Sequence, residues 1–185
     1  MFVMPDIQWV HRRKIVYLWI VRDMSCGCGK AKIDVPENVE WGPVFWKLLH
    51  GMAERSGTNT SIESQEEEKK LWEKLLSGLD KVIICVDCRE HLQAYKKSNP
   101  IAIPEKYMDL RLYVRRWVYD LHENVNARLG KPSFPFENIA KAQDLKLTLK
   151  TLNIIIQRAM HSSAVSILSW QKWVKYVRFL LGFYL

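Results

Sequence analysis

The apolar residues between positions 41 and 130 recur at helical spacing, and this period constrains the fold more than any other feature. Within residues 108–130, MDLRLYVRRWVYDLHENVNARLG, one helical side carries Leu110, Val114, Trp117, Leu121, Val125 and Leu129. Gly130 and Pro132 mark the end of that helix. No run alternates apolar and polar residues for long enough to make a strand. The pattern predicts an all-α chain in which residues 41–130 form a four-helix bundle.

Three further segments supply the other helices of the bundle. The first, 41–57, has Pro43 at the expected first helical position and Gly57 as its stop. The second, 64–83, has acidic residues in its first turn and a leucine stripe. The third, 85–97, places four side chains on one face: Cys88, His91, Leu92 and Tyr95.

The ends of the chain differ from this central segment. Residues 24–40 read as a glycine-containing flexible arm, and residues beyond 139 as two more helices. We therefore expect a domain at 41–139, an arm at 1–40 and a helical extension at 140–185. The apolar run at 15–21 is short for a signal peptide or a membrane span. Whether residues 1–23 belong to the working protein is left open, because Met24 could also be its start.

Charge is concentrated toward the ends of the chain. The whole sequence carries +8, yet residues 26–139 are neutral, whereas 140–185 hold seven Lys or Arg and one Asp. Such a tail indicates a docking surface for an acidic partner, a nucleic acid or a membrane, or else a solubilising tail. No nucleic-acid partner is expected, and contact with a membrane surface or a virion assembly is the preferred interpretation for residues 164–185. The alternative is that this segment folds back over the bundle or joins a dimer interface.

The four cysteines form two close pairs, Cys26 with Cys28 and Cys85 with Cys88. Disulfides within such short loops would restrain the unfolded chain little, so a purely structural, stabilising disulfide explains neither pair well. A zinc site would want four ligands: Cys85, Cys88 and His91 supply three, and Cys26 with Cys28 could complete or replace them. The single-residue gap of that first pair, in a glycine-rich arm, is poor spacing for zinc. A redox pair at a helix N-terminus explains more, because the helix end stabilises a thiolate. A thioredoxin-like βαβ context is missing, so such a pair needs another electron acceptor. No metal is therefore expected.

Three segments together resemble the Erv/ALR family of FAD-dependent sulfhydryl oxidases. They are WGPVFWKLLH at 41–50, CVDCREH at 85–91 and WVYDLHENVNARLGKPSF at 117–134. They occur in the family's order and spacing on a predicted four-helix bundle. The short domain without extra structural cysteines is most similar to members encoded by large DNA viruses.

The resemblance implies a mechanism and a cofactor. Cys88 would face the flavin of FAD, Cys85 would exchange disulfides with incoming thiols, and Cys26 and Cys28 would be a shuttle pair. Electrons from protein thiols would pass through FAD to molecular oxygen and give hydrogen peroxide. The FAD-binding residues would be Gly42, Trp46, His50, His91, Tyr95, Trp117, His122, Val125, Asn126 and Lys131.

The chain departs from the family pattern near the adenine end of the cofactor. Glu123 stands where an Asn usually follows the histidine, and the tryptophan after the third signature is missing. Phe134 or Phe136 could take the place of that tryptophan.

The resemblance also implies partners and a location. Family members commonly pair through the first two helices, so a homodimer is expected, with the stripe at 66–80 and the exposed side of the first helix in its interface. A viral member would work in the host cytoplasm or the virion and would not be secreted. The main alternative function is a virion or assembly structural protein built on the oxidase fold. In either case we expect residues 164–185 to dock the protein and to be dispensable for the chemistry.

Overall fold

The computed structural model describes residues 35–133, 135–138 and 144–185, and all the regular structure in them is helical. The α-helices are α2 (Asn38–Arg55), α3 (Ile62–Ser77), α4 (Val86–Ser98), α5 (Leu110–Arg128), α6 (Leu145–His161) and α7 (Ile167–Tyr184). Short 3-10 turns are η1 (Leu79–Lys81), η2 (Tyr107–Asp109) and η3 (Phe136–Asn138). The predicted all-α fold with additional C-terminal helices is confirmed.

Local sequence explains where most helices begin and end. Ser61 caps α3 by accepting a hydrogen bond from the Ser64 amide, and Cys85 occupies the same position before α4. Gly57 and Gly130 follow α2 and α5 with positive φ angles of 72° and 64°, which glycine adopts readily. The predicted stops at these two glycines are confirmed.

The predicted start of the first helix is wrong by one turn. The helix α2 begins at Asn38, where Glu37 and Glu40 form a reciprocal capping box. Pro43 therefore lies inside α2 and not at its first position. The capping box satisfies amide donors upstream of the proline, so the helix begins there although Pro43 can donate no backbone hydrogen bond.

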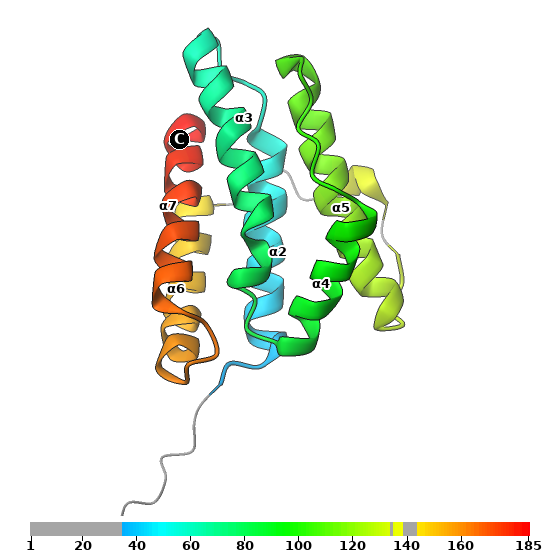
Figure 1. Ribbon diagram of the computed structural model, residues 1–185, viewed down its shortest axis with the longest axis vertical. Coiled ribbons are helices and arrows are strands. Elements are labelled where there is room, and N and C mark those ends of the chain that lie inside the picture. The colour runs from blue at the N-terminus through cyan, green and yellow to red at the C-terminus, as the bar shows by residue number, and fades with distance from the viewer. Residues whose placement is uncertain (1–34, 134, 139–143) are drawn as a thin grey trace, which may run out of the picture. The chain divides into compact units, whose positions relative to one another are not determined.

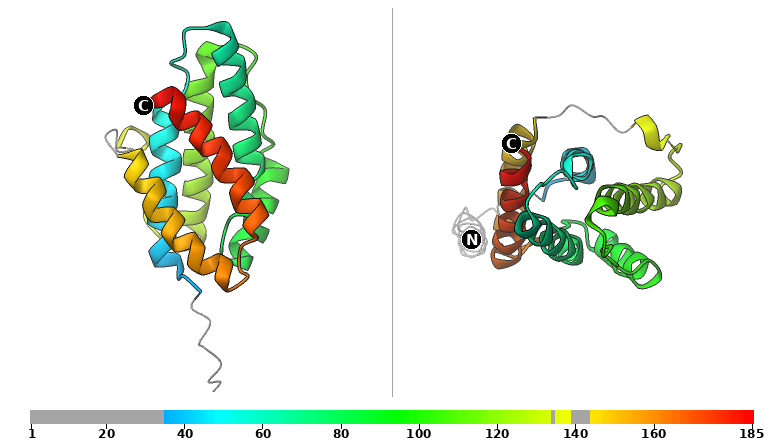
Figure 2. Two further views of the ribbon diagram at one scale, coloured as in Figure 1. Left: turned by 90° about the vertical axis from the view of Figure 1, so that its left-hand side faces the viewer. Right: turned by 90° about the horizontal axis from the view of Figure 1, so that it is seen from above.

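The C-terminal helices pack directly on the first two helices of the bundle. The helix α6 contacts α2 and α7 contacts α3, while α5 covers another side of α2 (Figure 1). Seen from a second direction, α6 and α7 together cross over α2 and α3 (Figure 2). No helix in the described ranges is both long and apolar enough to span a membrane.

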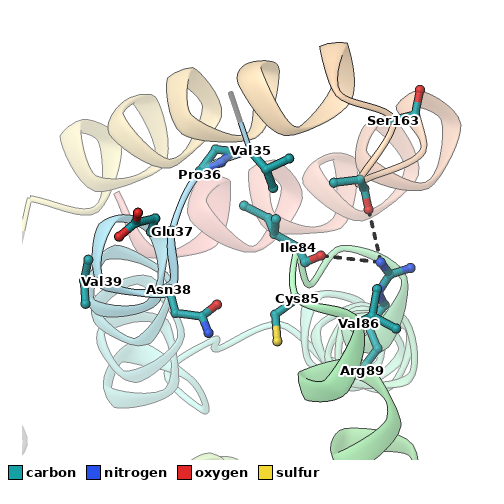
Figure 3. Close-up of a pocket in the computed structure, with 11 residues that line it drawn as sticks. Val35, Pro36, Glu37, Asn38, Val39, Ile84, Cys85, Val86, Arg89 and Ser163 are labelled. Carbon is teal, nitrogen blue, oxygen red and sulfur yellow. Dashed lines mark hydrogen bonds between the residues drawn. The ribbon is translucent and has the colours of Figure 1, made fainter. Parts of the chain in front are cut away.

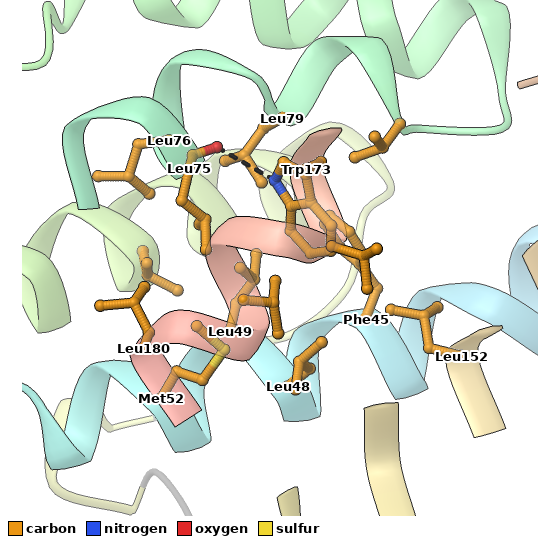
Figure 4. Close-up of a cluster of buried hydrophobic side chains, with 14 of the residues drawn as sticks. Phe45, Leu48, Leu49, Met52, Leu75, Leu76, Leu79, Leu152, Trp173 and Leu180 are labelled. Atoms are coloured by element: carbon orange, nitrogen blue, oxygen red, sulfur yellow. Dashed lines mark hydrogen bonds between the residues drawn. The ribbon is translucent and has the colours of Figure 1, made fainter. Parts of the chain in front are cut away.

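Trp173 of α7 is the centre of this contact. Its ring is 2% exposed, stacks 5.7 Å from Phe45 of α2, and donates a hydrogen bond of 3.1 Å to the Leu75 carbonyl of α3 (Figure 4). Five other α7 side chains are buried with it: Trp170, Val174, Val177, Leu180 and Leu181. The expectation that the apolar side of α7 is free for docking is wrong, because that side completes the core.

The last residues of α7 are also tied to α3 by polar contacts. The Tyr184 hydroxyl donates to the Glu68 carboxylate at 2.5 Å and accepts from the Trp72 indole at 2.8 Å. Glu68 is fully buried and also accepts from the Gly57 amide and Asn59 side chain. The C-terminal helix thus helps to satisfy a buried carboxylate that would otherwise destabilise the fold.

One part of the predicted dimer interface, the 66–80 stripe, is correspondingly unavailable. The apolar side chains of the 66–80 stripe, Leu71, Trp72, Leu75, Leu76 and Leu79, are all buried within one chain. The helix α7 covers this face, so the prediction that it pairs two copies is wrong. The homodimer itself stays a prediction, without that interface.

Candidate active site

The two central cysteines form a disulfide at the N-terminus of α4. Cys85 is the residue that caps the helix, and its Sγ accepts a hydrogen bond of 3.2 Å from the Cys88 amide. The unpaired amides and the positive end of the helix dipole favour negative charge at this position. When the disulfide is reduced, this environment stabilises a thiolate.

Each cysteine of this disulfide lines a different pocket. Cys85 lies in an open cleft of about 800 Å³ between the start of α2, the start of α4 and the α6–α7 turn (Figure 3). Cys88 lies in a more enclosed pocket of about 60 Å³ between α2, η1, α4 and α5. One disulfide thus connects an open surface with an enclosed, largely apolar space.

The enclosed pocket brings together residues from all three sequence signatures. Of the predicted cofactor-binding residues, Trp46, His91 and Val125 line it together with Cys88. The remaining lining residues were not predicted: Trp41, Phe45, Leu79, Ile83, Leu92, Leu121, Asn124 and Arg128. Four of them lie within the sequence signatures at 41–50 and 117–134, so they could have been predicted from those segments: Trp41, Phe45, Asn124 and Arg128.

Two histidines and a tryptophan form a stack beside this pocket. The Trp46 and His122 rings lie 4.0 Å apart and 7° from parallel. His50 Nε2 and His122 Nδ1 are 3.0 Å apart, joining α2 to α5 across 72 residues of sequence. One ring nitrogen donates and the other accepts, which requires at least one imidazole to be neutral.

Both imidazoles are held in the neutral form. Burial lowers the pKa of His50 to about 4, and the neighbouring His122 adds to the effect. Burial likewise lowers the pKa of His122 to about 4, with Glu123 opposing the shift and Lys131 supporting it. The stack is therefore an uncharged, flat surface at neutral pH.

We expect the protein to lose stability as the pH falls from about 6.5 toward about 4. In that window the unfolded histidines bind protons that the folded pair does not, so protonation favours the unfolded state. The loss between pH 7 and pH 5 should be about 1–3 kcal/mol, measured by urea unfolding. His122→Gln should weaken this dependence, whereas His161→Gln, which changes an exposed histidine of α6, should preserve it. Equal pH dependence in wild type and His122→Gln would contradict the assignment.

The other predicted cofactor-binding residues do not line the enclosed pocket. Asn126 is buried and donates to Glu123 at 2.9 Å. Trp117 is buried, meets Tyr95 edge to face and donates to the Asn99 carbonyl at 3.4 Å.

The two remaining residues predicted to bind the cofactor, Lys131 and Gly42, are less buried than Asn126 and Trp117. Lys131 is exposed, where it can meet a charged group of a ligand. Gly42 has no neighbour within 4 Å of an added Cβ, so no close approach of described atoms requires a glycine there.

Three sequence expectations remain, which concern the shuttle cysteines, the role of Phe134 and the zinc alternative. Cys26, Cys28 and Phe134 lie outside the described residues, so the structure does not place them. Within the described residues, no three His, Cys, Asp or Glu side chains gather to hold a metal ion. Cys85 and Cys88 are joined to each other in the disulfide.

The residues of the enclosed pocket fit a flavin nucleotide in kind. The aromatic rings of the pocket and the neutral imidazoles of the neighbouring His50–His122 stack suit a flat ring system. Two exposed cations suit a diphosphate: Arg128, which lines the pocket, and Lys131, which lies outside its lining. The enclosed volume of about 60 Å³ is small, so a ligand with several rings must extend beyond it. The disulfide sulfur in the pocket wall supplies a redox group beside such a ring.

Comparison with known proteins identifies one family. The profile of the Erv1 / Alr family matches residues 43–144, which is more than half of the chain. No solved structure matches the chain significantly.

Three curated relatives illustrate the similarity. The "FAD-linked sulfhydryl oxidase ERV1" of Oryza sativa subsp. japonica is 26% identical over 100 residues, covering 54% of this chain and 47% of the rice protein. The "FAD-linked sulfhydryl oxidase" of African swine fever virus is 30% identical over 93 residues, covering 50% and 71%. The "Mitochondrial FAD-linked sulfhydryl oxidase erv1" of Schizosaccharomyces pombe is 29% identical over 102 residues, covering 54% and 51%. The chain thus spans about half the length of the rice and yeast relatives.

Proposed function

Because this chain belongs to the Erv1/Alr family, we propose that it is an FAD-linked sulfhydryl oxidase that forms disulfides in protein thiols. The observation that carries the proposal is the disulfide whose two cysteines line different pockets. Such an arrangement lets thiols react at Cys85 while Cys88 stays beside an enclosed redox partner. The names of the curated relatives supply the cofactor and the reaction class.

Cys85 is the proposed site of thiol attack. A substrate thiolate attacks Cys85 Sγ, the Cys85–Cys88 bond breaks, and its electron pair leaves on Cys88 Sγ. A second substrate thiol then resolves the mixed disulfide, which releases an oxidised substrate and leaves both cysteines reduced. The N-terminus of α4 stabilises the thiolate that leaves.

The cofactor is held by the residues around the enclosed pocket in this proposal. Trp46, His91 and Val125 line the ring site with Cys88, and His50, His122 and Asn126 extend it along α2 and α5. When bound, FAD supplies a two-electron acceptor for the Cys85–Cys88 dithiol. Tyr95 and Trp117 pack α4 against α5, and no described atom lies within 4 Å of a Cβ added at Gly42. The exposed Lys131 would meet the diphosphate.

The finer features of the reaction rest on the family resemblance. We propose molecular oxygen as the final electron acceptor, hydrogen peroxide as its product, and Cys26 with Cys28 as a shuttle pair for substrate electrons. The proposed FAD-binding segment begins with α2 at Asn38, and not at residue 41 as the sequence predicted, and ends at residue 139. Residues 140–185 are the extension that packs on it, and the arm precedes α2. The viral relatives support a viral protein of the host cytoplasm or virion.

Contact with a virion or a membrane through residues 164–185 stays a prediction. Most of the apolar side chains of α7 are buried, so only exposed ones such as Leu168 and Phe179 remain to make it.

The visible absorption spectrum tests the proposed function most directly. The purified chain should be yellow, with flavin bands that persist through gel filtration, and it should consume oxygen when given dithiothreitol. Adding more FAD should not be needed for this activity. A folded protein without flavin, or a yellow protein that leaves dithiothreitol reduced, would contradict the proposal.

A further inference from the structure

The C-terminal extension reaches the redox disulfide at one place, the turn between α6 and α7. Ser163 and Ala164 of this turn line the open cleft with Cys85 (Figure 3). The opposite side of the cleft is formed by residues 35–39, which lead into α2. A segment far from the family signatures in sequence thus forms part of the surface that an incoming thiol meets.

The α6–α7 turn is held in a single conformation by its own hydrogen bonds. The amides of Ala164 and Val165 both donate to the Ala159 carbonyl, at 2.9 and 3.3 Å, and the Ser163 amide donates to the Met160 carbonyl at 3.0 Å. Ser163 has a φ of 59°, the left-handed conformation that a non-glycine residue seldom adopts. The buried Val165 anchors the end of the turn in the core. This turn is therefore a fixed wall of the cleft.

Arg89 links that wall to the redox helix. Its guanidinium donates to the Ala164 carbonyl of the turn at 3.3 Å and to the Ile84 carbonyl before α4 at 3.4 Å (Figure 3). Arg89 lies one residue after Cys88 on α4. The same helical turn therefore carries the disulfide and the side chain that hydrogen-bonds the α6–α7 turn. The position of the wall relative to Cys85 is set by this residue.

The lining of the cleft indicates what it binds. Three apolar side chains at its rim are well exposed, Val35 at 44%, Val39 at 76% and Val86 at 59%. Glu37 and Arg89 are the two charged lining residues, so the lining has no net charge. Exposed apolar side chains gathered around a reactive group mark a contact site. The volume of about 800 Å³ is near the upper end of the range for ligand pockets, roughly 300–1,000 Å³, and exceeds what a small dithiol needs.

We propose that this cleft binds an extended segment of a substrate protein whose cysteine is flanked by apolar residues, and that the α6–α7 turn is part of this thiol-binding site. The occupant must carry a thiol, because the disulfide at Cys85 reacts with nothing else offered by a polypeptide at neutral pH. The exposed valines bind its apolar flanks, while Arg89 acts as a positioning residue for the wall. The inference rests on the proposed oxidase function and adds a substrate preference to it.

The test uses two reduced peptides, each with a pair of cysteines, one flanked by valines and one by lysines. The enzyme is the full chain with Cys26→Ser and Cys28→Ser, so that peptides react at Cys85 directly. Rates of oxygen uptake give kcat/KM for each peptide relative to that for dithiothreitol. We expect kcat/KM to be at least fivefold higher for the valine peptide than for the lysine peptide, because its KM is lower.

Charge added to the cleft should reverse this preference. Two substitutions test this, Val39→Glu on the α2 side and Ser163→Asp on the turn. Each should change the ratio of the two kcat/KM values about fivefold or more in favour of the lysine peptide. Ile62→Glu is the matched control for Val39→Glu, since Ile62 is 74% exposed in the first turn of α3. Thr60→Asp, in an exposed loop outside the cleft, is the control for Ser163→Asp.

The outcomes separate this inference from the function on which it rests. If the wild-type chain has no flavin or leaves dithiothreitol reduced, the proposed function fails. If the wild-type chain is yellow and active but the Cys26→Ser, Cys28→Ser chain oxidises the two peptides with equal kcat/KM, the inference alone is overturned. A shift with Val39→Glu but not with the folded Ser163→Asp variant would remove the turn from the site.

Discussion

Replacing Cys88 by serine is expected to reduce oxidation of dithiothreitol on the order of 10³-fold or more, as for the loss of an essential catalytic residue. Cys88 is the cysteine that lines the enclosed pocket with Trp46 and His91. When the Cys88 sulfur is removed, the disulfide with Cys85 cannot form, so a substrate thiol has no disulfide to reduce. No sulfur then remains beside the enclosed pocket to pass electrons to the flavin. The substitution removes one sulfur from a half-buried position, so the helical fold and bound flavin should persist.

The expected measurement is oxygen uptake together with the visible and far-ultraviolet spectra. Cys85→Ser should lose activity to a similar extent, because the disulfide is lost there too. Ala94→Ser, at an exposed position of α4, should keep the wild-type rate and controls for substitution on this helix. Retention of more than a few per cent of the activity by a yellow Cys88→Ser protein would contradict the assigned role. A structural protein built on this fold would keep its biological role in the Cys88→Ser variant.

Ending the chain after residue 139 is expected to abolish cooperative folding. The truncation removes α6 and α7, whose buried side chains cover α2 and α3. Burial of each large apolar side chain stabilises a fold by about 1.5–3 kcal/mol, and α7 alone contributes six such residues. This loss is comparable to the whole stability of a typical domain, about 5–15 kcal/mol. The truncation also removes Tyr184, which contacts the buried Glu68 carboxylate.

Thermal unfolding followed by circular dichroism measures this effect. A truncated chain with a cooperative transition within a few degrees of the full chain would contradict the expectation. So would a stable truncated dimer, in which a second copy replaces α6 and α7 on the exposed face. Sedimentation at micromolar concentration distinguishes that dimer from an unfolded chain.

A single substitution isolates the contribution of α7 to the core. Trp173→Ala should cost about 3–5 kcal/mol, since it removes a buried ring and its hydrogen bond to Leu75. Phe179→Ala removes an aromatic ring from the same helix where it is 53% exposed, and should change stability by less than about 0.5 kcal/mol. Equal effects of the two substitutions would show that α7 does not complete the core.

The helices themselves could be predicted from local sequence. Their apolar period, the cap at Ser61 and the stops at Gly57 and Gly130 act within a few residues, so their effects are visible in the chain. Pro43 shows where this fails, because the capping box of Glu37 and Glu40 extends the helix upstream of a residue that usually begins one. The signatures likewise contained most residues of the enclosed pocket.

The sequence by itself determined an all-helical chain, a cysteine pair at a helix N-terminus and the family to which the chain belongs. Only the tertiary structure decided that α7 covers α3, that Cys85 and Cys88 line different pockets, and that the α6–α7 turn forms a wall beside Cys85. The physical reason is that helix caps and periods depend on neighbouring residues, whereas apolar burial has no direction. An apolar stripe must be covered, but any complementary apolar face can cover it. The α7 stripe is therefore compatible with a docking helix, which the sequence analysis preferred, and with a core helix, and only its packing partner distinguishes the two.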